Sequence, residues 1–155
     1  MRLTTFTDYS LRVLIFLAAQ PDRRATIAEV ADAFRISESH LTKVVHGLGK
    51  AGFLANARGH GGGLQLAKQA RDINVGAVVR ATEGAAMPAE CFDAESNECA
   101  ITRVCRLRGV LAEAVRAFYA VLDRYSLEDL VSNRQPLGRI LFTARGRPVR
   151  RAVRR

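Results

Sequence analysis

Two short amphipathic helices separated by a turn, with a glycine-rich hairpin directly behind them, constrain the fold of this chain more than any other feature. Thr26 and Glu29 have capping-box spacing, which predicts a helix that runs to about Phe34. Ser37 is expected to cap the next helix, which runs to Lys50 and ends before Gly52. A short helix, a turn of about three residues and a second amphipathic helix form the helix-turn-helix pattern.

The second of these helices has one apolar and one polar face. Four apolar residues repeat at helical spacing and are expected to face the core: Leu41, Val44, Val45 and Leu48. The opposite face has hydroxyls, imidazoles and lysines, and no acid follows Glu38, so its chemistry suits base edges and phosphates. An ordinary solvated helix face is the alternative. The candidate DNA-binding residues there are Ser37, Ser39, His40, Thr42, Lys43, His46 and Lys50.

The hairpin favours the DNA-binding interpretation. Two short strands with alternating character, predicted at 53–57 and 64–67, flank a segment rich in glycine. A hairpin directly after a recognition helix is typical of a wing, and Arg58 and His60 near its tip are candidates to enter a minor groove. The order of these elements predicts a mainly α protein with a winged helix-turn-helix.

Two glycine-containing strings do not support an enzyme. The segment 60–63 resembles the oxyanion-hole string of some esterases, but no serine lies in a Gly-x-Ser-x-Gly sequence. The segment 47–50 lacks the spacing of a phosphate-binding loop. We therefore predict that the chain is not an enzyme.

Charge and hydropathy add weaker constraints. The formal net charge is +9, and subtracting the six arginines of segment 143–155 leaves +3, so the rest of the chain is only mildly basic. Segment 143–155 is expected to be a basic disordered tail. No apolar run is long enough to span a membrane and no secretory signal is recognisable, so we expect a cytoplasmic protein.

Helices are also predicted on both sides of the reading elements. A largely buried helix is expected at 5–19, and Asn74 is expected to cap another that ends near Gly84. A long helix is expected from about Ala100 to Tyr125, and a short final helix from Ser126, closed by Asn133 and Pro136. The long helix carries a heptad repeat, which favours a two-fold dimer over packing within one chain: Val104, Leu111, Val115, Phe118, Leu122 and Tyr125.

Three cysteines, Cys91, Cys99 and Cys105, lie close together in a predicted loop that leads into the long helix. An odd, clustered set argues against a disulfide framework and for metal, cluster or redox chemistry. The absence of a Cys-x-x-Cys pair counts against structural zinc. Neighbouring arginines, Arg103, Arg106 and Arg108, would offset the charge of thiolates. On spacing alone, an iron–sulfur cluster, inert thiols and a redox dithiol all remain open.

These features divide the chain into four expected segments. A DNA-binding region at 1–84 is followed by a cysteine-bearing sensor loop at 85–105. A dimerisation helix with a closing helix occupies 106–142, and the tail is 143–155. A dimer of winged helices would suit a palindromic operator in double-stranded DNA.

The opening sequence from Met1 to Arg12, the glycine-rich wing and the three late cysteines together resemble the NsrR–IscR family of iron–sulfur repressors. The resemblance covers about residues 1–125 and is strongest to the nitric-oxide-sensing branch. It implies a homodimeric repressor of nitric-oxide-detoxification genes, which releases its operator when nitric oxide nitrosylates the cluster. It also implies a cluster, 4Fe–4S in preference to 2Fe–2S, with these ligands: Cys91, Cys99, Cys105 and Asp8 from the partner subunit.

The opening helix carries the fourth of these ligands. Asp8 and Arg12 lie four residues apart on one predicted helix face, so Arg12 would adjoin the cluster. The alternative for Asp8 is a simple ion pair with Arg12. The gap between Cys91 and Cys99 is longer than expected for the family, so the longer loop could offer Asp93, Glu95 or Glu98 in place of Cys91.

Three other functions are compatible with parts of the pattern. The same architecture could sense cluster supply or redox state rather than nitric oxide. A repressor without a cluster would leave the cysteines as bystanders. A thiol-based redox enzyme or metal-binding adaptor is disfavoured, because no His or Asp lies beside a cysteine at a nucleophile-like spacing.

Overall fold

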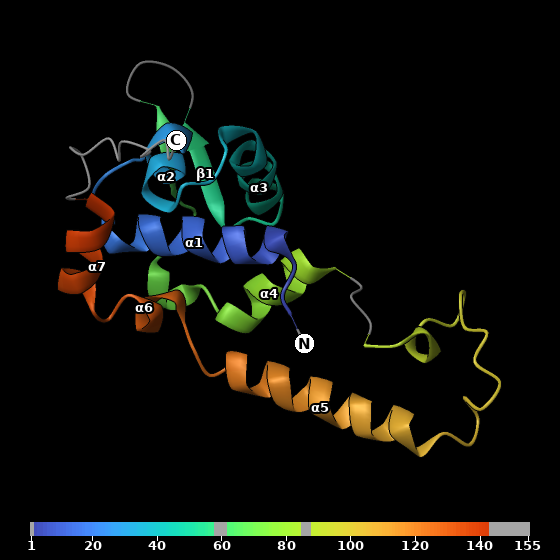
Figure 1. The fold of residues 1–155 in the computed structure, drawn as a ribbon. Helices are drawn as coiled ribbons and strands as arrows, with labels where there is room; N and C mark the ends of the chain where they lie inside the picture. Colours follow the sequence, from blue (N-terminus) through green and yellow to red (C-terminus); the bar gives the residue numbers. More distant parts are fainter. Residues whose placement is uncertain (1, 58–61, 85–87, 143–155) are drawn as a thin grey trace, which may run out of the picture.

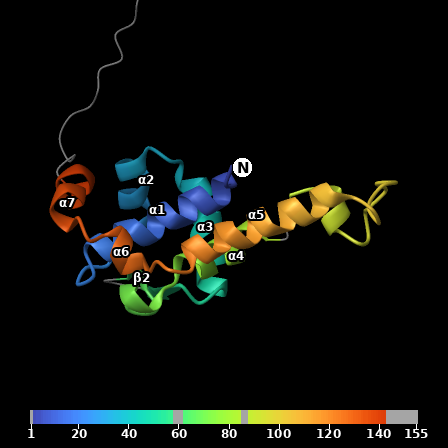
Figure 2. The same ribbon diagram turned by 90° about the horizontal axis from the view of Figure 1, so that it is seen from below.

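The computed structural model describes residues 2–57, 62–84 and 88–142. Figure 1 shows a head, formed by the described parts of 2–84 together with 126–142, and an arm, formed by α5. The sensor segment, residues 88–105, lies at the end of the arm that is farther from α6 (Figures 1 and 2). The elements are α1 (Thr5–Ala19), α2 (Ile27–Phe34), α3 (Glu38–Lys50), β1 (Leu54–Ala57), β2 (Gly63–Leu66), η1 (Ala70–Asp72), α4 (Val75–Glu83), η2 (Glu90–Phe92), α5 (Arg106–Leu122), α6 (Leu127–Leu130) and α7 (Arg134–Phe142).

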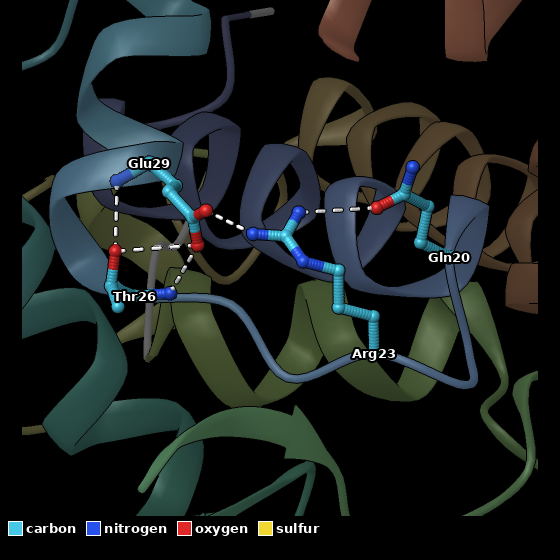
Figure 3. Close-up of polar contacts among 4 residues, drawn as sticks. All are labelled: Gln20, Arg23, Thr26 and Glu29. Atoms are coloured by element: carbon cyan, nitrogen blue, oxygen red, sulfur yellow. Dashed lines mark hydrogen bonds and ion pairs between the residues drawn. The ribbon is translucent and has the colours of Figure 1, made fainter. Parts of the chain in front are cut away.

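Helix α2 begins with the expected capping box. The Glu29 backbone N–H donates to Thr26 Oγ1 at 3.2 Å, and the Thr26 backbone N–H donates to Glu29 Oε2 at 2.9 Å. Arg23 also pairs with Glu29 and donates to Gln20 Oε1, so the loop after α1 is tied to the first turn of α2 (Figure 3). Partial desolvation opposes ionisation of Glu29, but the hydrogen bonds from Thr26 and Arg23 outweigh it and lower its pKa below the usual value.

The turn between α2 and α3 and the C-terminal end of α3 also lie where the sequence predicted them. Arg35 adopts a left-handed conformation with φ of 55°, and the next residue, Ile36, is buried. Helix α3 ends where the Phe53 N–H donates to the Leu48 carbonyl at 3.0 Å and Gly52 has φ of 75°. This is a Schellman ending, in which glycine adopts the left-handed conformation without a Cβ penalty.

The wing is present as an antiparallel hairpin, with Leu54 paired to Leu66 and Ala57 paired to Gly63. Ala25 joins it through two backbone hydrogen bonds with Leu64, at 3.1 and 2.7 Å. The hairpin is therefore anchored to the loop before α2, on the side of the reading helices. This architecture confirms the prediction of a mainly α fold with a winged helix-turn-helix. Within the described ranges, no helix combines the length and apolar character needed to cross a bilayer.

Helix α1 is the centre of the head, as Figure 1 shows, and it packs against α3, α4 and α6. Its Val13 and Leu14 are fully buried, and they share a core with Leu41 and Leu48 of α3. The buried side chains of α3 are the four that the sequence predicted. The opposite face of α3 is therefore directed away from the core.

The prediction of a helix from Ala100 is wrong at its start. Helix α5 begins at Arg106, and Cys105 is its N-cap. Turns precede it because Asn97 Oδ1 accepts a hydrogen bond from the Cys99 N–H at 3.2 Å and lies 3.1 Å from Thr102 Oγ1. Such local side-chain contacts give the backbone an alternative to helix. All three cysteines thus lie before α5.

The heptad prediction also needs correction, because Val104 and Tyr125 fall outside α5. Its other four members, Leu111, Val115, Phe118 and Leu122, are half-buried. The exposed apolar residues form a neighbouring row at heptad spacing, which we call the arm stripe: Leu107, Val110, Ala114, Ala117 and Val121.

The prediction that Asn133 and Pro136 close the last helix is wrong as well. Helix α6 has the expected cap at Ser126, but a further helix, α7, contains Pro136 in its first turn. Proline is tolerated there because the first N–H groups of a helix have no intrahelical acceptor. Phe142 of α7 packs edge-on against Phe16 of α1, with ring centroids 5.0 Å apart. The chain therefore returns to the head after the arm.

Candidate nucleic-acid interface and metal-binding segment

The outer face of α3 presents the predicted reading side chains to solvent. All seven of the candidates on and before this helix are exposed: Ser37, Ser39, His40, Thr42, Lys43, His46 and Lys50. The face combines hydroxyls, imidazoles and ammonium groups, which can donate to phosphates and to base edges. Arg58 and His60, the wing candidates, lie outside the described residues.

The N-terminus of α3 differs in detail from the expectation. Ser37 occupies the N-cap position, but its side chain makes no capping hydrogen bond. Its Oγ lies 3.0 Å from His40 Nδ1 and 3.3 Å from Ser39 Oγ. The first N–H groups of α3 are thus left without a side-chain acceptor, a state in which helix N-termini bind phosphate oxygens.

The sequence missed one residue at this interface. Tyr9 of α1 is half-buried, and its ring lies against His40, with ring centroids 6.3 Å apart. The guanidinium carbon of Arg12 lies over the same ring, 5.9 Å from its centroid. Tyr9 therefore connects α1 to the polar face of α3. No local pattern predicts this, because it depends on how α1 crosses α3.

Asp8 forms the ion pair that the sequence offered as the alternative to metal binding. Arg12 Nε donates to Asp8 Oδ1 at 3.0 Å, and Arg12 Nη2 lies 2.8 Å from Oδ2. Both side chains are about four-tenths exposed, at 44% for Asp8 and 41% for Arg12. Exposed pairs of this kind contribute little stability, so the carboxylate can exchange Arg12 for another partner at small cost.

The start of α1, beside Asp8, is fastened to the end of α4. Glu83 accepts hydrogen bonds from the backbone N–H of Thr4 at 2.8 Å and from its hydroxyl at 3.1 Å. Desolvation opposes ionisation of Glu83, but hydrogen bonds from Thr7 and Thr4 outweigh it and lower its pKa below the usual value. A carboxylate in this place also complements the positive end of the helix dipole of α1.

The three cysteines are free and half-buried, and each lies on a different local element. Cys91 is in η2, Cys99 is in the turn closed by Asn97, and Cys105 is the N-cap of α5. The guanidinium of Arg108 lies 5.7 Å from the ring centroid of Phe92, so η2 is held against the first turn of α5.

The described residues of this single chain do not form a complete set of metal ligands. Among the described residues, no three or more side chains of His, Cys, Asp or Glu come close enough together to hold a metal ion. The sensor segment lies beyond the end of the arm, whereas α1, whose first turn contains Asp8, lies in the head (Figures 1 and 2). The described structure therefore does not bring Asp8 together with these cysteines.

The donor chemistry of the sensor segment nevertheless fits an iron–sulfur cluster. Three free thiols are available, and thiolates are the usual ligands of iron–sulfur clusters. Cys105 is the N-cap of α5 and makes no side-chain capping hydrogen bond. Of the alternative donors, Asp93 is engaged locally. Its Oδ2 accepts from Ser96 Oγ at 2.6 Å and its Oδ1 from the Glu95 N–H at 3.0 Å, and these bonds lower its pKa. Glu95 and Glu98 are exposed.

A recognition helix with an uncovered polar face, a preceding helix and turn, and a wing define a winged helix-turn-helix transcriptional regulator. The family model described as Rrf2, iron-dependent transcriptional regulator, matches residues 3–133. The chain therefore belongs to the Rrf2 family of iron-dependent transcriptional regulators. This membership confirms the family resemblance and the prediction that the chain is not an enzyme.

Individual relatives agree with this assignment. The chain is 49% identical to the HTH-type transcriptional regulator NsrR of Bacillus subtilis, over 91% of this chain and 97% of that one. It is 50% identical to the regulator of the same name from Geobacillus kaustophilus, over 94% of this chain and all of that one.

Solved structures share the fold. T. potens IscR is 24% identical and superposes with a TM-score of 0.68 over 88% of this chain and 90% of that one. CymR (YrzC), the global cysteine regulator of B. subtilis, is 28% identical, with a TM-score of 0.66 over 86% and 98% of the two chains.

Proposed function

We propose that this chain is a cytoplasmic, homodimeric iron–sulfur repressor that binds a palindromic operator and releases it in response to nitric oxide. One observation carries the proposal: the same chain joins an uncovered recognition face to a segment with three free thiols outside the head. Near 50% identity to regulators named NsrR, over more than nine-tenths of the chain, supports the nitric-oxide signal.

The arm supports the homodimer. No residue of α5 is buried, and Leu107 and Val110 of the arm stripe are 60% and 61% exposed. Heptad-spaced apolar residues on a helix bury themselves by packing against the same row of a second copy. Two heads related by a two-fold axis would then read half-sites about 34–36 Å apart.

The cofactor would be held between the chains. Cys91, Cys99 and Cys105 would supply thiolates, and the partner subunit's Asp8 would supply a carboxylate oxygen. The family resemblance favours a 4Fe–4S cluster over a 2Fe–2S cluster. When bound, the cluster would supply the reactivity toward nitric oxide.

The protein's own residues would convert that chemistry into DNA release. Arg106 and Arg108 offset thiolate charge at the start of α5, and Arg12 competes for Asp8. With Asp8 held by the partner's sensor segment, α1 of one chain is fastened to the arm of the other. With Asp8 returned to Arg12, that fastening is lost and the heads can shift. Displacements of an ångström or two break bidentate base contacts, each worth about 1–3 kcal/mol.

The proposed division of labour follows the segments that the sequence suggested. Residues 1–84 would read DNA, with Arg58 and His60 in the minor groove and the exposed face of α3 in the major groove. Residues 85–105 would be the sensor, and 106–142 would provide dimerisation and the closing helices. Segment 143–155 would add basic charge.

The experiment is the absorbance spectrum of the protein purified without oxygen, combined with operator binding before and after nitric oxide. The unaltered protein should show cluster absorption and should lose operator affinity with nitric oxide. Cys91→Ala, Cys99→Ala and Cys105→Ala should each lose the absorption, and Asp8→Ala should change the spectrum. Asp22→Ala, an exposed carboxylate in the loop after α1, is the matched control and should change neither.

Other outcomes would replace the proposal. A response to oxygen, reductant or cluster loss but not to nitric oxide would identify a sensor of redox state or cluster supply. A colourless preparation with full operator affinity would identify a repressor without a cluster. If Asp8→Ala keeps the full absorbance spectrum, Asp8 is not a ligand of the cluster.

A further inference from the structure

The arm meets the head at one compact polar joint, formed by Gly76 and Arg80 of α4 and Asp123 at the end of α5. Arg80 Nη1 donates to Asp123 Oδ1 at 2.7 Å, and Arg80 Nη2 donates to Oδ2 at 2.6 Å. The two parallel bonds fix both distance and orientation, as single contacts between flexible side chains do not. The hydrogen bond from Arg80 holds the pKa of Asp123 below its usual value, so the pair is ionised at neutral pH.

Glycine at position 76 is what allows this approach. A Cβ added there would overlap Asp123 Oδ1 and lie 3.1 Å from Arg80 Nη1. Gly76 is in the first turn of α4 and is itself buried. The carboxylate therefore lies directly over the backbone of α4, near the positive end of its helix dipole.

The neighbouring contacts reinforce the joint on both sides. The ring of Tyr119 in α5 lies under Arg80, with the guanidinium carbon 4.5 Å from its centroid. Asn74 Nδ2 donates to the Asp123 carbonyl at 2.7 Å, and the Val75 N–H donates to the Tyr125 carbonyl at 2.9 Å. The end of the arm is thus attached through side chains and backbone to the start of α4.

The joint lies in the main contact between the arm and the head, so its geometry bears on the direction of the arm. Among the head elements, α4 is the one with which α5 makes extensive contact in the described structure, and α5 has no buried residue. A helix of 17 residues is about 25 Å long, so a rotation of about 10° at one end moves the other by about 4 Å. Adjacent base pairs of DNA are about 3.4 Å apart. A rotation of this size at the joint would therefore change the distance between the two heads by about the rise of one base pair.

We propose that Gly76, Arg80 and Asp123 are positioning residues that set the operator spacing which the dimer accepts. They touch neither the recognition face nor the sensor cysteines. They act by fixing the angle between each head and the arm through which two chains associate. This inference rests on the proposed function, because it requires a dimer that reads two half-sites.

The test compares spacing preference with half-site affinity. A duplex selected from a random pool by the unaltered, iron-loaded protein provides the operator. Derivatives with one base pair removed or inserted between the half-sites, and a single half-site, complete the probe set. The unaltered protein should bind the original spacing about tenfold or more tightly than either derivative, because a misplaced head loses base contacts.

Two variants disturb the joint in different ways: Gly76→Ala by overlap and Asp123→Ala by loss of the ion pair. Each should reduce the spacing preference to within about threefold while its half-site affinity and dimer mass remain unchanged. Exchange of the charges, Arg80→Asp with Asp123→Arg, should restore part of the preference that Arg80→Asp alone loses. Glu128→Ala breaks an exposed ion pair with Arg134 elsewhere on the head and should retain the full preference.

Each remaining outcome is decisive. Full spacing discrimination in both joint variants would overturn the inference, and so would a parallel loss of half-site affinity, which indicates a general structural role. If Gly76→Ala does not fold, Asp123→Ala and the charge exchange decide the question. If the unaltered protein selects no two-part site, the proposed dimeric function fails instead.

Discussion

The head and the arm differ in how far one copy of the chain covers its own apolar side chains. In the head, Leu14, Leu41 and Leu48 have no exposed surface. In the arm, α5 has no buried residue, and Leu107 and Val110 are more than half exposed. Burial of apolar surface is the main stabilising contribution to folding. One chain therefore completes the head, whereas the arm would gain the same stabilisation from the second copy that we propose.

The largest expected effect comes from the core of the head. Leu48→Ala should lower the free energy of unfolding by about 2–5 kcal/mol, because it leaves a cavity among fully buried neighbours. Leu107→Ala removes the same atoms from an exposed place and should cost much less in the isolated chain. Urea denaturation of dilute protein measures both, and equal losses would contradict the contrast between head and arm.

The next effect tests whether the arm stripe is an interface. Val110→Glu should convert the dimer to monomer in sedimentation, because it places a carboxylate in the apolar row. Operator affinity should then fall about a hundredfold or more toward that of a half-site, because the linked second head is lost. Arg116→Glu, on the opposite face of α5, is the control. A dimer that survives Val110→Glu would place the interface elsewhere.

A smaller effect is expected on the recognition face. Lys43→Ala should weaken binding by a similar factor on different sequences and reduce the slope of log affinity against log salt by about 1, because one phosphate contact is lost. Lys68→Ala removes an exposed lysine that is not on α3 and should leave the slope unchanged. A change in sequence preference with an unaltered salt slope would instead place Lys43 on a base.

The smallest effect concerns the cap that fastens the helix-turn-helix. Folding lowers the pKa of Glu29, so its ionised form adds stability above the pKa that it has in the unfolded chain. This contribution should be lost as the pH falls through the lower pKa of the folded state. The difference in unfolding free energy between the unaltered chain and Glu29→Gln should therefore shrink in acid. Glutamine keeps a capping acceptor, so it isolates the charge.

The features that the sequence predicted well depend on residues near one another in the chain. The starts of α2 and α6 follow from capping boxes at Thr26 and Ser126, and the end of α3 follows from Gly52. The buried and exposed faces of α3 follow from helical periodicity. The residue types of the candidate interface and the cysteine segment were recognisable for the same reason.

The errors occurred where contacts overrode such patterns. The apolar spacing before Arg106 suggested helix, but Asn97 and Thr102 close a turn there. Pro136 suggested a stop, but it lies in a first turn whose helix is stabilised by packing of Phe142 on Phe16. The heptad repeat predicted an apolar row on α5 that is half-buried in the structure. The exposed row is the neighbouring arm stripe, which the sequence analysis did not identify.

The sequence by itself determined the order of the helix-turn-helix and the wing, the polar face of α3 and the presence of three thiols near the start of the arm. These properties depend on hydrogen bonds and side-chain periodicity within a few residues. Only the tertiary structure decided that Tyr9 meets His40, that α7 returns to α1, and that Asp123 lies over Gly76. Such contacts join residues far apart in the chain, and they depend on the directions that packing of the whole core imposes on each helix.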